Sequence, residues 1–148
     1  MFRALLLKQE ENKKATATVE DIDVSNLPEG DVLVKINYST INYKDSLALT
    51  SSSPIVKNFP MVPGIDFSGE VEETSNENFQ IGDKVILNGF GVGEKYWGGL
   101  AQKARVKGEW VVKLPEKLTQ KQAMAIGTAG YTAMFMCFGT GKTGSYSR

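Results

Sequence analysis

The feature that most constrains the fold is a series of short strand-like segments separated by turns. Apolar and β-branched residues recur in segments 2–8, 15–22, 32–38, 65–73, 84–87, 100–106 and 110–113. In the third segment the alternation places Val32, Val34, Ile36 and Tyr38 on one face, as in a strand with one buried side. Glycine and proline mark the turns between segments, as at residues 27–31. The pattern predicts a mainly β fold, built as a small barrel or rolled sheet.

Helical signals are few and occur mainly late in the chain. Residues 44–49 could form a short helix after Asn42. Thr119 and Gln122 have the spacing of a capping box, which predicts a helix that begins there and breaks near Gly127. A second helix is expected to start after Thr128. The fold class is therefore mainly β with short helices.

Length and charge limit the classes of partner. With 148 residues, of which 41% are hydrophobic, the chain suits one well-packed domain. Lysine plus arginine and aspartate plus glutamate each number 17, so the basic surplus of a nucleic-acid or anionic-membrane binder is missing. No apolar run has the length of a membrane span. We expect a small-molecule substrate as partner, with no nucleic acid and no membrane.

The counts of histidine and cysteine exclude several mechanisms. There is no histidine, so this chain cannot form a Ser-His-Asp or Cys-His centre. Cys137 is the only cysteine, which leaves too few ligands for zinc and none for an intrachain disulfide. We expect no metal and a cytoplasmic location, where thiols stay reduced. Any enzyme built on this chain must take its chemistry from a bound organic cofactor.

Residues 127–133 are unusually rich in small side chains. Glycine and alanine bury little apolar surface, but they let the backbone approach another body closely. We interpret this stretch as the place where the chain meets a cofactor and the domain that holds it.

Several motifs give the chain a resemblance to a known family, and they occur in a matching order at residues 42–45, 59–69, 82–85, 97–102, 104–108 and 127–133. The chain resembles the zinc-independent medium-chain dehydrogenase/reductases, in the quinone oxidoreductase branch that includes the acrylyl-CoA reductases. The resemblance covers residues 1–137 and implies a GroES-like β-barrel catalytic domain that ends with the start of a linker helix. In full-length relatives a nucleotide-binding Rossmann domain follows, and we find no such domain in this sequence. The resemblance also allows a homodimer in the full-length family.

The activity implied by the resemblance is hydride transfer from NADPH, in preference to NADH. The acceptor would be a quinone or an α,β-unsaturated carbonyl or thioester such as acryloyl-CoA. Tyr43 matches the family tyrosine near the reacting ring, with roles in catalysis and cofactor binding. Asn42 is a catalytic candidate or a helix N-cap. Thr128 is a cofactor-binding candidate, through a contact with a ribose or a pyrophosphate. Alternatively, Thr128 caps the second helix. The two roles are compatible, because a helix N-terminus favours phosphate.

Three further residues have weaker assignments. Phe90 and Trp97 flank a glycine-rich segment that the resemblance places beside the substrate, although an ordinary connecting loop explains the glycines equally well. Asp66 occupies the place of a glutamate near the metal in zinc-dependent relatives. Without metal ligands, we expect Asp66 to organise the loop that follows residues 63–64.

The end of the chain departs from the family. Residues 139–144 fit the G-x-G-x-x-G spacing, but only four residues follow, too few for a dinucleotide-binding unit. We expect residues 138–148 to be a disordered tail outside the family pattern.

A second function class stays open. The chain could be a non-catalytic GroES-like barrel that acts as a binding or oligomeric module. Such a module should cover the face around Tyr43 and Thr128 with its own tail or a partner, whereas the catalytic part of an enzyme should leave that face open.

Overall fold

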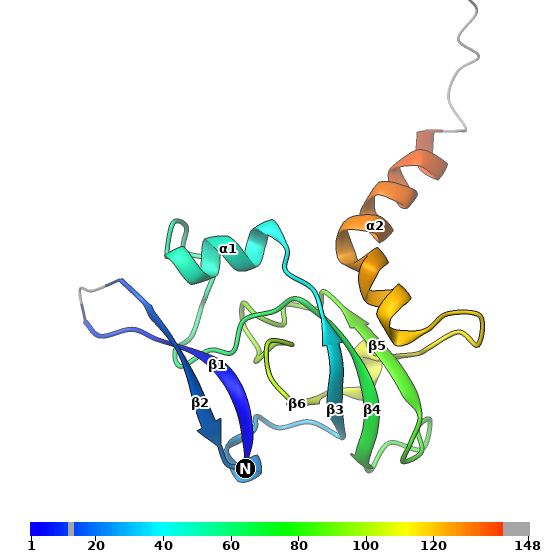
Figure 1. The fold of residues 1–148 in the computed structure, drawn as a ribbon, viewed down its shortest axis with the longest axis horizontal. Helices are drawn as coiled ribbons and strands as arrows, with labels where there is room; N and C mark the ends of the chain where they lie inside the picture. The colour runs from blue at the N-terminus through cyan, green and yellow to red at the C-terminus, as the bar shows by residue number, and fades with distance from the viewer. Residues whose placement is uncertain (12–13, 141–148) are drawn as a thin grey trace, which may run out of the picture.

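The computed structural model describes residues 1–11 and 14–140, with side chains up to residue 137. Its elements follow the predicted order (Figure 1). They are β1 (Phe2–Lys8), β2 (Thr16–Ile22), the 3-10 helix η1 (Val24–Asn26), β3 (Val32–Ser39), α1 (Tyr43–Thr50), β4 (Asp66–Thr74), β5 (Lys84–Asn88), β6 (Lys103–Val106), the 3-10 helix η2 (Gly108–Trp110), β7 (Val112–Lys113) and α2 (Gln120–Thr140). The mainly β class with helices is confirmed.

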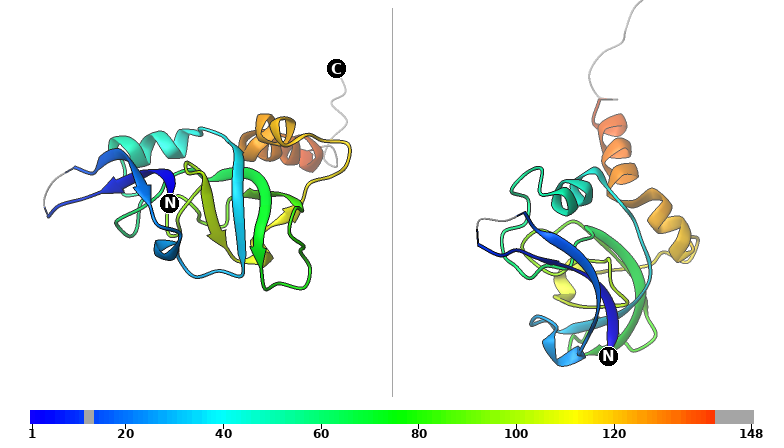
Figure 2. Two further views of the ribbon diagram at one scale, coloured as in Figure 1. Left: turned by 60° about the horizontal axis from the view of Figure 1, so that its bottom comes forward. Right: turned by 60° about the vertical axis from the view of Figure 1, so that its left-hand side comes forward.

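The strands form two antiparallel sheets that curve around a shared interior (Figure 2). One is the β1–β2 hairpin, and the other has the order β6-β3-β4-β5-β7. Backbone hydrogen bonds join β1 to the segment that leads into β6, from Leu5 N to Leu100 O at 2.9 Å and from Gln102 N to Arg3 O at 2.9 Å. Both helices lie at one end of the sheets, opposite the N-terminus (Figures 1 and 2).

The first three residues of β3, 32–34, are buried on both faces of the strand. Val32 and Val34 belong to the core enclosed by the five-stranded sheet, while Leu33 packs with Phe2 and other residues under the hairpin. The expected one-sided alternation is wrong at Tyr38, which is 44% exposed. A register shift between Ile36 and Tyr38 interrupts the pairing with β4 and turns Tyr38 away from the core.

Helix α2 begins and breaks where the sequence predicts. Gln122 N–H donates to Thr119 Oγ1 at 3.2 Å, and Thr119 N–H donates to Gln122 Oε1 at 2.9 Å, which confirms the capping box. The first half of the helix is fixed to β4, because Gln120 Nε2 donates to Gly69 O at 2.8 Å. Gly127 then has non-helical backbone angles, and the second half points away from the sheets (Figure 1).

Helix α2 extends to Thr140, past residue 137 where we expect the family-like part to end. Residues 141–148, which hold most of the expected tail and of the G-x-G-x-x-G match, lie outside the described residues.

Candidate functional site

The side chain of Asp66 connects the two ends of the candidate site. Asp66 is the first residue of β4 and is fully buried. Its Oδ2 accepts from Thr40 Oγ1 at 3.0 Å and from Asn42 Nδ2 at 3.1 Å. The same oxygen accepts from the backbone N–H of Thr128 at 2.8 Å, and the Thr128 hydroxyl donates to Oδ1. One buried carboxylate therefore holds the approach to α1 and the second half of α2 together.

The position of Asp66 follows from the sheet. The end of β3 pairs with the start of β4, and Ser39 Oγ donates to Asp66 O at 2.7 Å. The chain then leaves β3 through residues 40–42 into α1, so Thr40 and Asn42 pass over the Asp66 side chain.

The break at Gly127 brings Thr128 to the same carboxylate. Gly127 has φ 52° and ψ −167°, a conformation that side-chain-bearing residues rarely adopt. A Cβ atom at this position would lie 3.1 Å from Asp66 Oδ2 and 3.3 Å from Thr40 Cγ2. Glycine thus permits both the turn of the backbone and its close approach to Asp66.

This contact corrects two expectations. The sequence predicts that Asp66 organises the loop after residues 63–64, but its side chain instead binds residues 40, 42 and 128. The sequence also allows Thr128 to cap the second helix and leave its N-terminus favourable for phosphate. The cap comes from Asp66, because the first N–H after the break already donates to that carboxylate.

Asn42 lies at the N-cap of α1 with extended backbone, and its N–H donates to Asp45 Oδ2 at 2.8 Å. Its side-chain amide donates to Thr40 Oγ1 at 2.8 Å as well as to Asp66. Tyr43 is the first residue of the helix and is 79% exposed, so its phenol faces solvent. Asn42, Tyr43 and Thr128 are therefore brought to one region by the Asp66 network.

Asp45 is a second buried carboxyl group near the site. Its Oδ1 accepts from Gly64 N–H at 3.1 Å, which connects α1 to the turn before β4. Burial raises the pKa of Asp45 above its ordinary value, although backbone hydrogen bonds from Asn42 and Gly64 act in the opposite direction.

The two residues predicted for the substrate loop have different surroundings in the structure. Trp97 is partly buried against two core clusters, and its Nε1 donates to Pro60 O at 3.0 Å. Phe90 is 56% exposed and stacks on Trp110 with ring centroids 6.2 Å apart. Tyr96 also contacts Trp110, with centroids 4.7 Å apart. Sequence reasoning misses Trp110 because it lies far along the chain, in a segment expected to be a plain strand.

The loop that carries Phe90 and Tyr96 is joined to α1. Lys44 Nζ lies 2.8 Å from Glu94 Oε1, and the backbone N–H of Lys57 donates to Glu94 O at 2.8 Å. These contacts place the loop beside the helix that begins with Tyr43.

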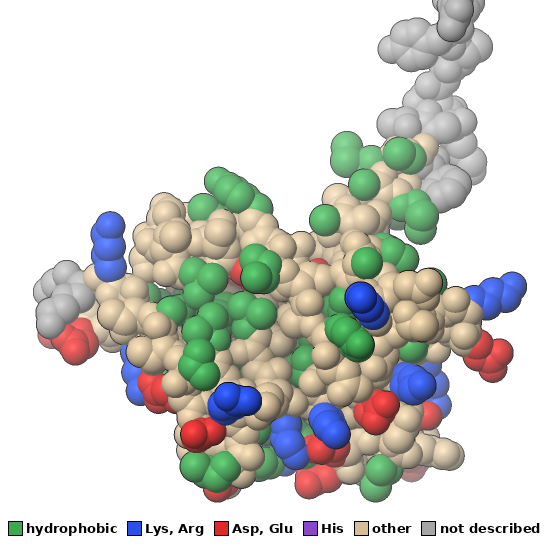
Figure 3. Space-filling model, in the orientation of Figure 1, with side chains coloured by type: hydrophobic (Ala, Val, Ile, Leu, Met, Phe, Trp, Pro, Cys, Tyr) green, Lys and Arg blue, Asp and Glu red, His purple; other side chains and the backbone are tan. Residues whose placement is uncertain are grey.

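Apolar side chains gather on the exposed half of α2, as Figure 3 shows. Every described residue from 131 to 137 is exposed. The large apolar residues among them are Tyr131 (62% exposed), Met134 (56%), Phe135 (70%) and Met136 (65%). Together with Ile41 and Tyr43 they leave this end of the molecule open in the described part of the chain.

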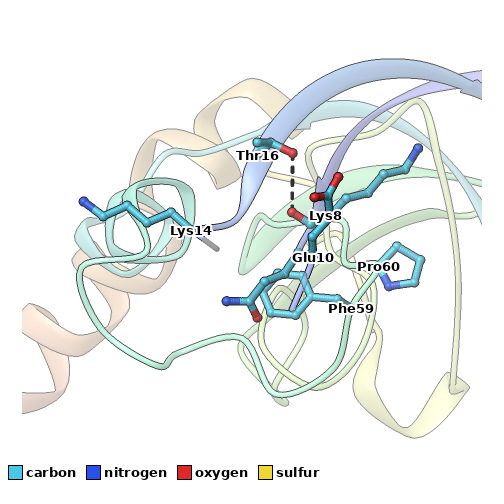
Figure 4. Close-up of a pocket in the computed structure, with 7 residues that line it drawn as sticks. Lys8, Glu10, Lys14, Thr16, Phe59 and Pro60 are labelled. Carbon is cyan, nitrogen blue, oxygen red and sulfur yellow. Dashed lines mark hydrogen bonds between the residues drawn. The ribbon is translucent and has the colours of Figure 1, made fainter. Parts of the chain in front are cut away.

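A cavity of about 580 Å³ lies elsewhere, at the end of the β1–β2 hairpin where the connecting loop lies (Figure 4). Its lining includes Lys8, Glu10, Thr16 and Phe59, and Thr16 Oγ1 donates to Lys8 O at 3.4 Å. No residue of the Asp66 network lines it. We do not assign the candidate site to this cavity, because it brings none of the predicted site residues together.

Within residues 1–11 and 14–140, no three or more histidine, cysteine, aspartate or glutamate side chains are grouped as metal ligands would be. Neither α1 nor α2, as far as the structure describes them, is long and apolar enough to cross a bilayer.

Comparison with known proteins identifies close relatives. The chain is 51% identical to acrylyl-CoA reductase AcuI from Ruegeria pomeroyi over 135 residues, which cover 90% of this chain and 41% of that protein. The yhdH oxidoreductase from Salmonella enterica, solved in complex with NADP, has a TM-score of 0.90 and 49% identity, covering 93% of this chain and 42% of that one. The Bacillus subtilis protein yhfP, solved with NAD bound, has a TM-score of 0.92 and 38% identity. The match covers 97% of this chain and 44% of that one.

These relatives confirm the resemblance found in the sequence. The chain spans about two fifths of the length of each of them. The family model of the alcohol dehydrogenase GroES-like domain matches residues 28–116, and the chain belongs to that family.

Proposed function

We propose that the chain is the catalytic-domain part of an NADPH-dependent oxidoreductase that reduces a quinone or an α,β-unsaturated carbonyl or thioester of the acryloyl-CoA kind. The observation that carries this proposal is the Asp66 network, which joins the half-buried Asn42 and Thr128 next to the exposed Tyr43. The relatives support it, since one is named an acrylyl-CoA reductase and two were solved with NADP or NAD.

The residues fit the nicotinamide end of a dinucleotide. When bound, NADPH would supply the hydride, which no protein side chain can donate. Asn42 and Thr128 provide neutral polar groups fixed by the network, and Tyr43 provides a phenol that can donate a hydrogen bond. We assign to Tyr43 the contact with the nicotinamide or the substrate carbonyl, where a donor stabilises developing negative charge on oxygen.

The loop beside α1 is the proposed substrate side of the site. Phe90 lies exposed on that loop and stacks on Trp110, which offers an aromatic surface to a flat or acyl group. Trp97 has a supporting position instead, because its ring is packed and its N–H already has an acceptor.

The apolar face of α2 fits the catalytic-domain part of an enzyme that packs against a further domain. The described apolar residues of α2 next to Tyr43 and Thr128 are more than half exposed at Tyr131, Met134 and Phe135, whereas a non-catalytic module would need its own tail or a partner to cover them. An apolar surface of this kind is typical of a face that packs against another domain.

Activity measurements test the proposal. The complete reading frame that encodes this chain should be expressed beside residues 1–148 and assayed for NADPH oxidation with acryloyl-CoA and with a quinone. We expect the complete product to oxidise NADPH in an acceptor-dependent manner. A correctly folded complete product that neither binds nor oxidises NADPH with any acceptor of these classes would contradict the proposal.

A further inference from the structure

The hydroxyl hydrogen of Thr128 is directed at a buried carboxylate. The hydroxyl donates to Oδ1 of Asp66, while the backbone N–H of the same residue donates to Oδ2 at 2.8 Å. An ionised carboxylate can only accept hydrogen bonds, so every group that contacts it must donate. The Thr128 side chain is half-buried, and its oxygen lone pairs are what it can offer to a ligand.

The side chains of Thr40 and Asn42 also direct their hydrogens toward the buried carboxylate or toward each other. Thr40 Oγ1 donates to Asp66 and accepts from Asn42 Nδ2 at 2.8 Å. The second contact of Asn42 Nδ2 is Asp66 itself, at 3.1 Å. The hydrogens of these side chains thus point inward, to the carboxylate or to each other.

An anionic ligand group is disfavoured at this point. The helix N-terminus after Gly127 would attract a phosphate if its N–H groups were free. Its first N–H already donates to Asp66, whose negative charge is buried with no lysine or arginine among its described hydrogen bonds. A phosphate oxygen next to Thr128 would meet a second negative charge and an oxygen that has no hydrogen left to donate.

We infer that Asp66 is a positioning residue that fixes the polarity of Thr128, so that Thr128 meets the cofactor as a hydrogen-bond acceptor. The group it selects is a donor on the nicotinamide riboside half of the cofactor, either the carboxamide NH₂ or a ribose hydroxyl. This assignment replaces a pyrophosphate contact for Thr128. The inference rests on the proposed function and adds to it that Thr128 Oγ1 accepts a hydrogen bond from the cofactor.

The polarity is tested first without ligand, on residues 1–148. We expect the Thr128 hydroxyl proton to exchange slowly with water and to resonate downfield in proton NMR spectra, because it donates to a buried charge. In Asp66→Asn the new amide donates to Thr128 Oγ1 in place of the lost acceptor, and the slowly exchanging signal should disappear. A signal that is absent from the wild type, or unchanged in a folded Asp66→Asn variant, would overturn the inference.

Asp31→Asn is the matched control. Asp31 lies directly before β3, at the opposite end of the strand from Thr40. Like Asp66, it accepts from a backbone N–H, that of Gly108 at 2.6 Å, and from a side-chain amide, Asn76 Nδ2 at 2.8 Å. Its substitution removes a hydrogen-bonded but less buried carboxylate at the other end of β3 from Thr40, and it should leave the Thr128 hydroxyl signal in place.

The ligand is tested on the product of the complete reading frame. The probes are NADPH, its 3-acetylpyridine analogue, which lacks the carboxamide NH₂, and an analogue that lacks a hydroxyl on the nicotinamide ribose. We expect one analogue to bind about tenfold more weakly than NADPH, since an acceptor left without its donor loses affinity of that order. The analogue that weakens identifies the donor, and equal binding of all three would overturn the inference.

Variants of Thr128 allow the ligand test to be made even if the Asp66→Asn variant does not fold. Thr128→Ser keeps the hydroxyl and should keep the discrimination, whereas Thr128→Val removes it and should bind all three probes alike. If Thr128→Val still oxidised NADPH and still bound one analogue more weakly than NADPH, the inference would be overturned. A complete product without any use of NADPH would instead overturn the proposed function, so the two failures can be told apart.

Discussion

Oδ1 of Asp45 accepts a hydrogen bond from the backbone N–H of Gly64 at 3.1 Å, across 19 residues of sequence. Asp45 is only 1% exposed, and the contact fixes α1 against the turn that leads into β4. The interaction stabilises the site region, but it places a carboxyl group where its ionised form is poorly solvated.

Asp45 should give the stability a measurable dependence on pH. Burial raises its pKa in the folded state, so the folded protein binds more protons than the unfolded chain between the ordinary and the raised value. The contribution of Asp45 to stability is complete below the ordinary pKa and is lost as pH rises through the folded pKa. In urea unfolding measured against pH, the stability advantage of wild type over Asp45→Asn should shrink across this window.

The difference between the two proteins is the quantity to measure. The pKa values of Glu20, Asp23, Asp31 and Asp83 are lowered by hydrogen bonds, and these groups have the opposite effect on the wild-type curve. An advantage that grows with rising pH would show that Asp45 ionises readily in the folded protein.

Gly127→Ala should destabilise the chain by about 1–3 kcal/mol, because the residue has φ 52° and its new Cβ would lie 3.1 Å from Asp66 Oδ2. Gly82→Ala is the control, since Gly82 also has a positive φ of 89° but has no atom within 4 Å of the position that a Cβ would take. Urea denaturation should show the larger loss for Gly127→Ala. Equal losses would mean that backbone conformation alone makes glycine necessary at residue 127.

Trp97→Phe should lower the free energy of unfolding by about 0.5–1.5 kcal/mol through loss of the hydrogen bond to Pro60 O. Trp110→Phe is the matched change, because that ring packs against the core and against Phe90, Tyr96 and Lys107, with no side-chain hydrogen bond in the described part of the chain. Thermal unfolding should therefore place Trp97→Phe below Trp110→Phe. The reverse order would assign the greater structural role to Trp110.

Tyr43→Phe should leave stability within about 0.5 kcal/mol of wild type, since the side chain is 79% exposed. In the complete reading frame the same change should reduce the rate of NADPH oxidation, because the phenol hydroxyl is the proposed donor. Steady-state rates together with circular dichroism check both statements. Full activity in Tyr43→Phe would show that the hydroxyl takes no part in the reaction.

Residues 1–148 alone should bind NADPH more weakly than about 1 mM. The proposed contacts of Tyr43 and Thr128 net about 0.5–1.5 kcal/mol each, too little to offset the lost freedom of a flexible dinucleotide. Isothermal titration calorimetry should detect no saturable binding in the micromolar range. Micromolar affinity would mean that residues 1–148 contain a cofactor site beyond the one described above.

Local patterns are enough to predict most elements but not the network that joins them. The apolar segment at residues 2–8 and the capping box at Thr119 are local signals, and the structure confirms the strand and the capping box. The partners of Asp66 lie 24, 26 and 62 residues away, so their convergence depends on sheet register and on the break at Gly127. The same holds for Tyr38, where one bulge reverses the face that alternation predicts.

The burial of residues 32–34 of β3 on both faces has a consequence for how the chain unfolds. Val32 and Val34 support the core of the five-stranded sheet, and Leu33 supports the core beneath the hairpin, so neither core can be disrupted without losing contacts with the same strand. The hairpin is therefore energetically coupled to the larger sheet although few backbone hydrogen bonds connect them. Heating should melt both cores in one cooperative transition, with calorimetric and van't Hoff enthalpies that agree.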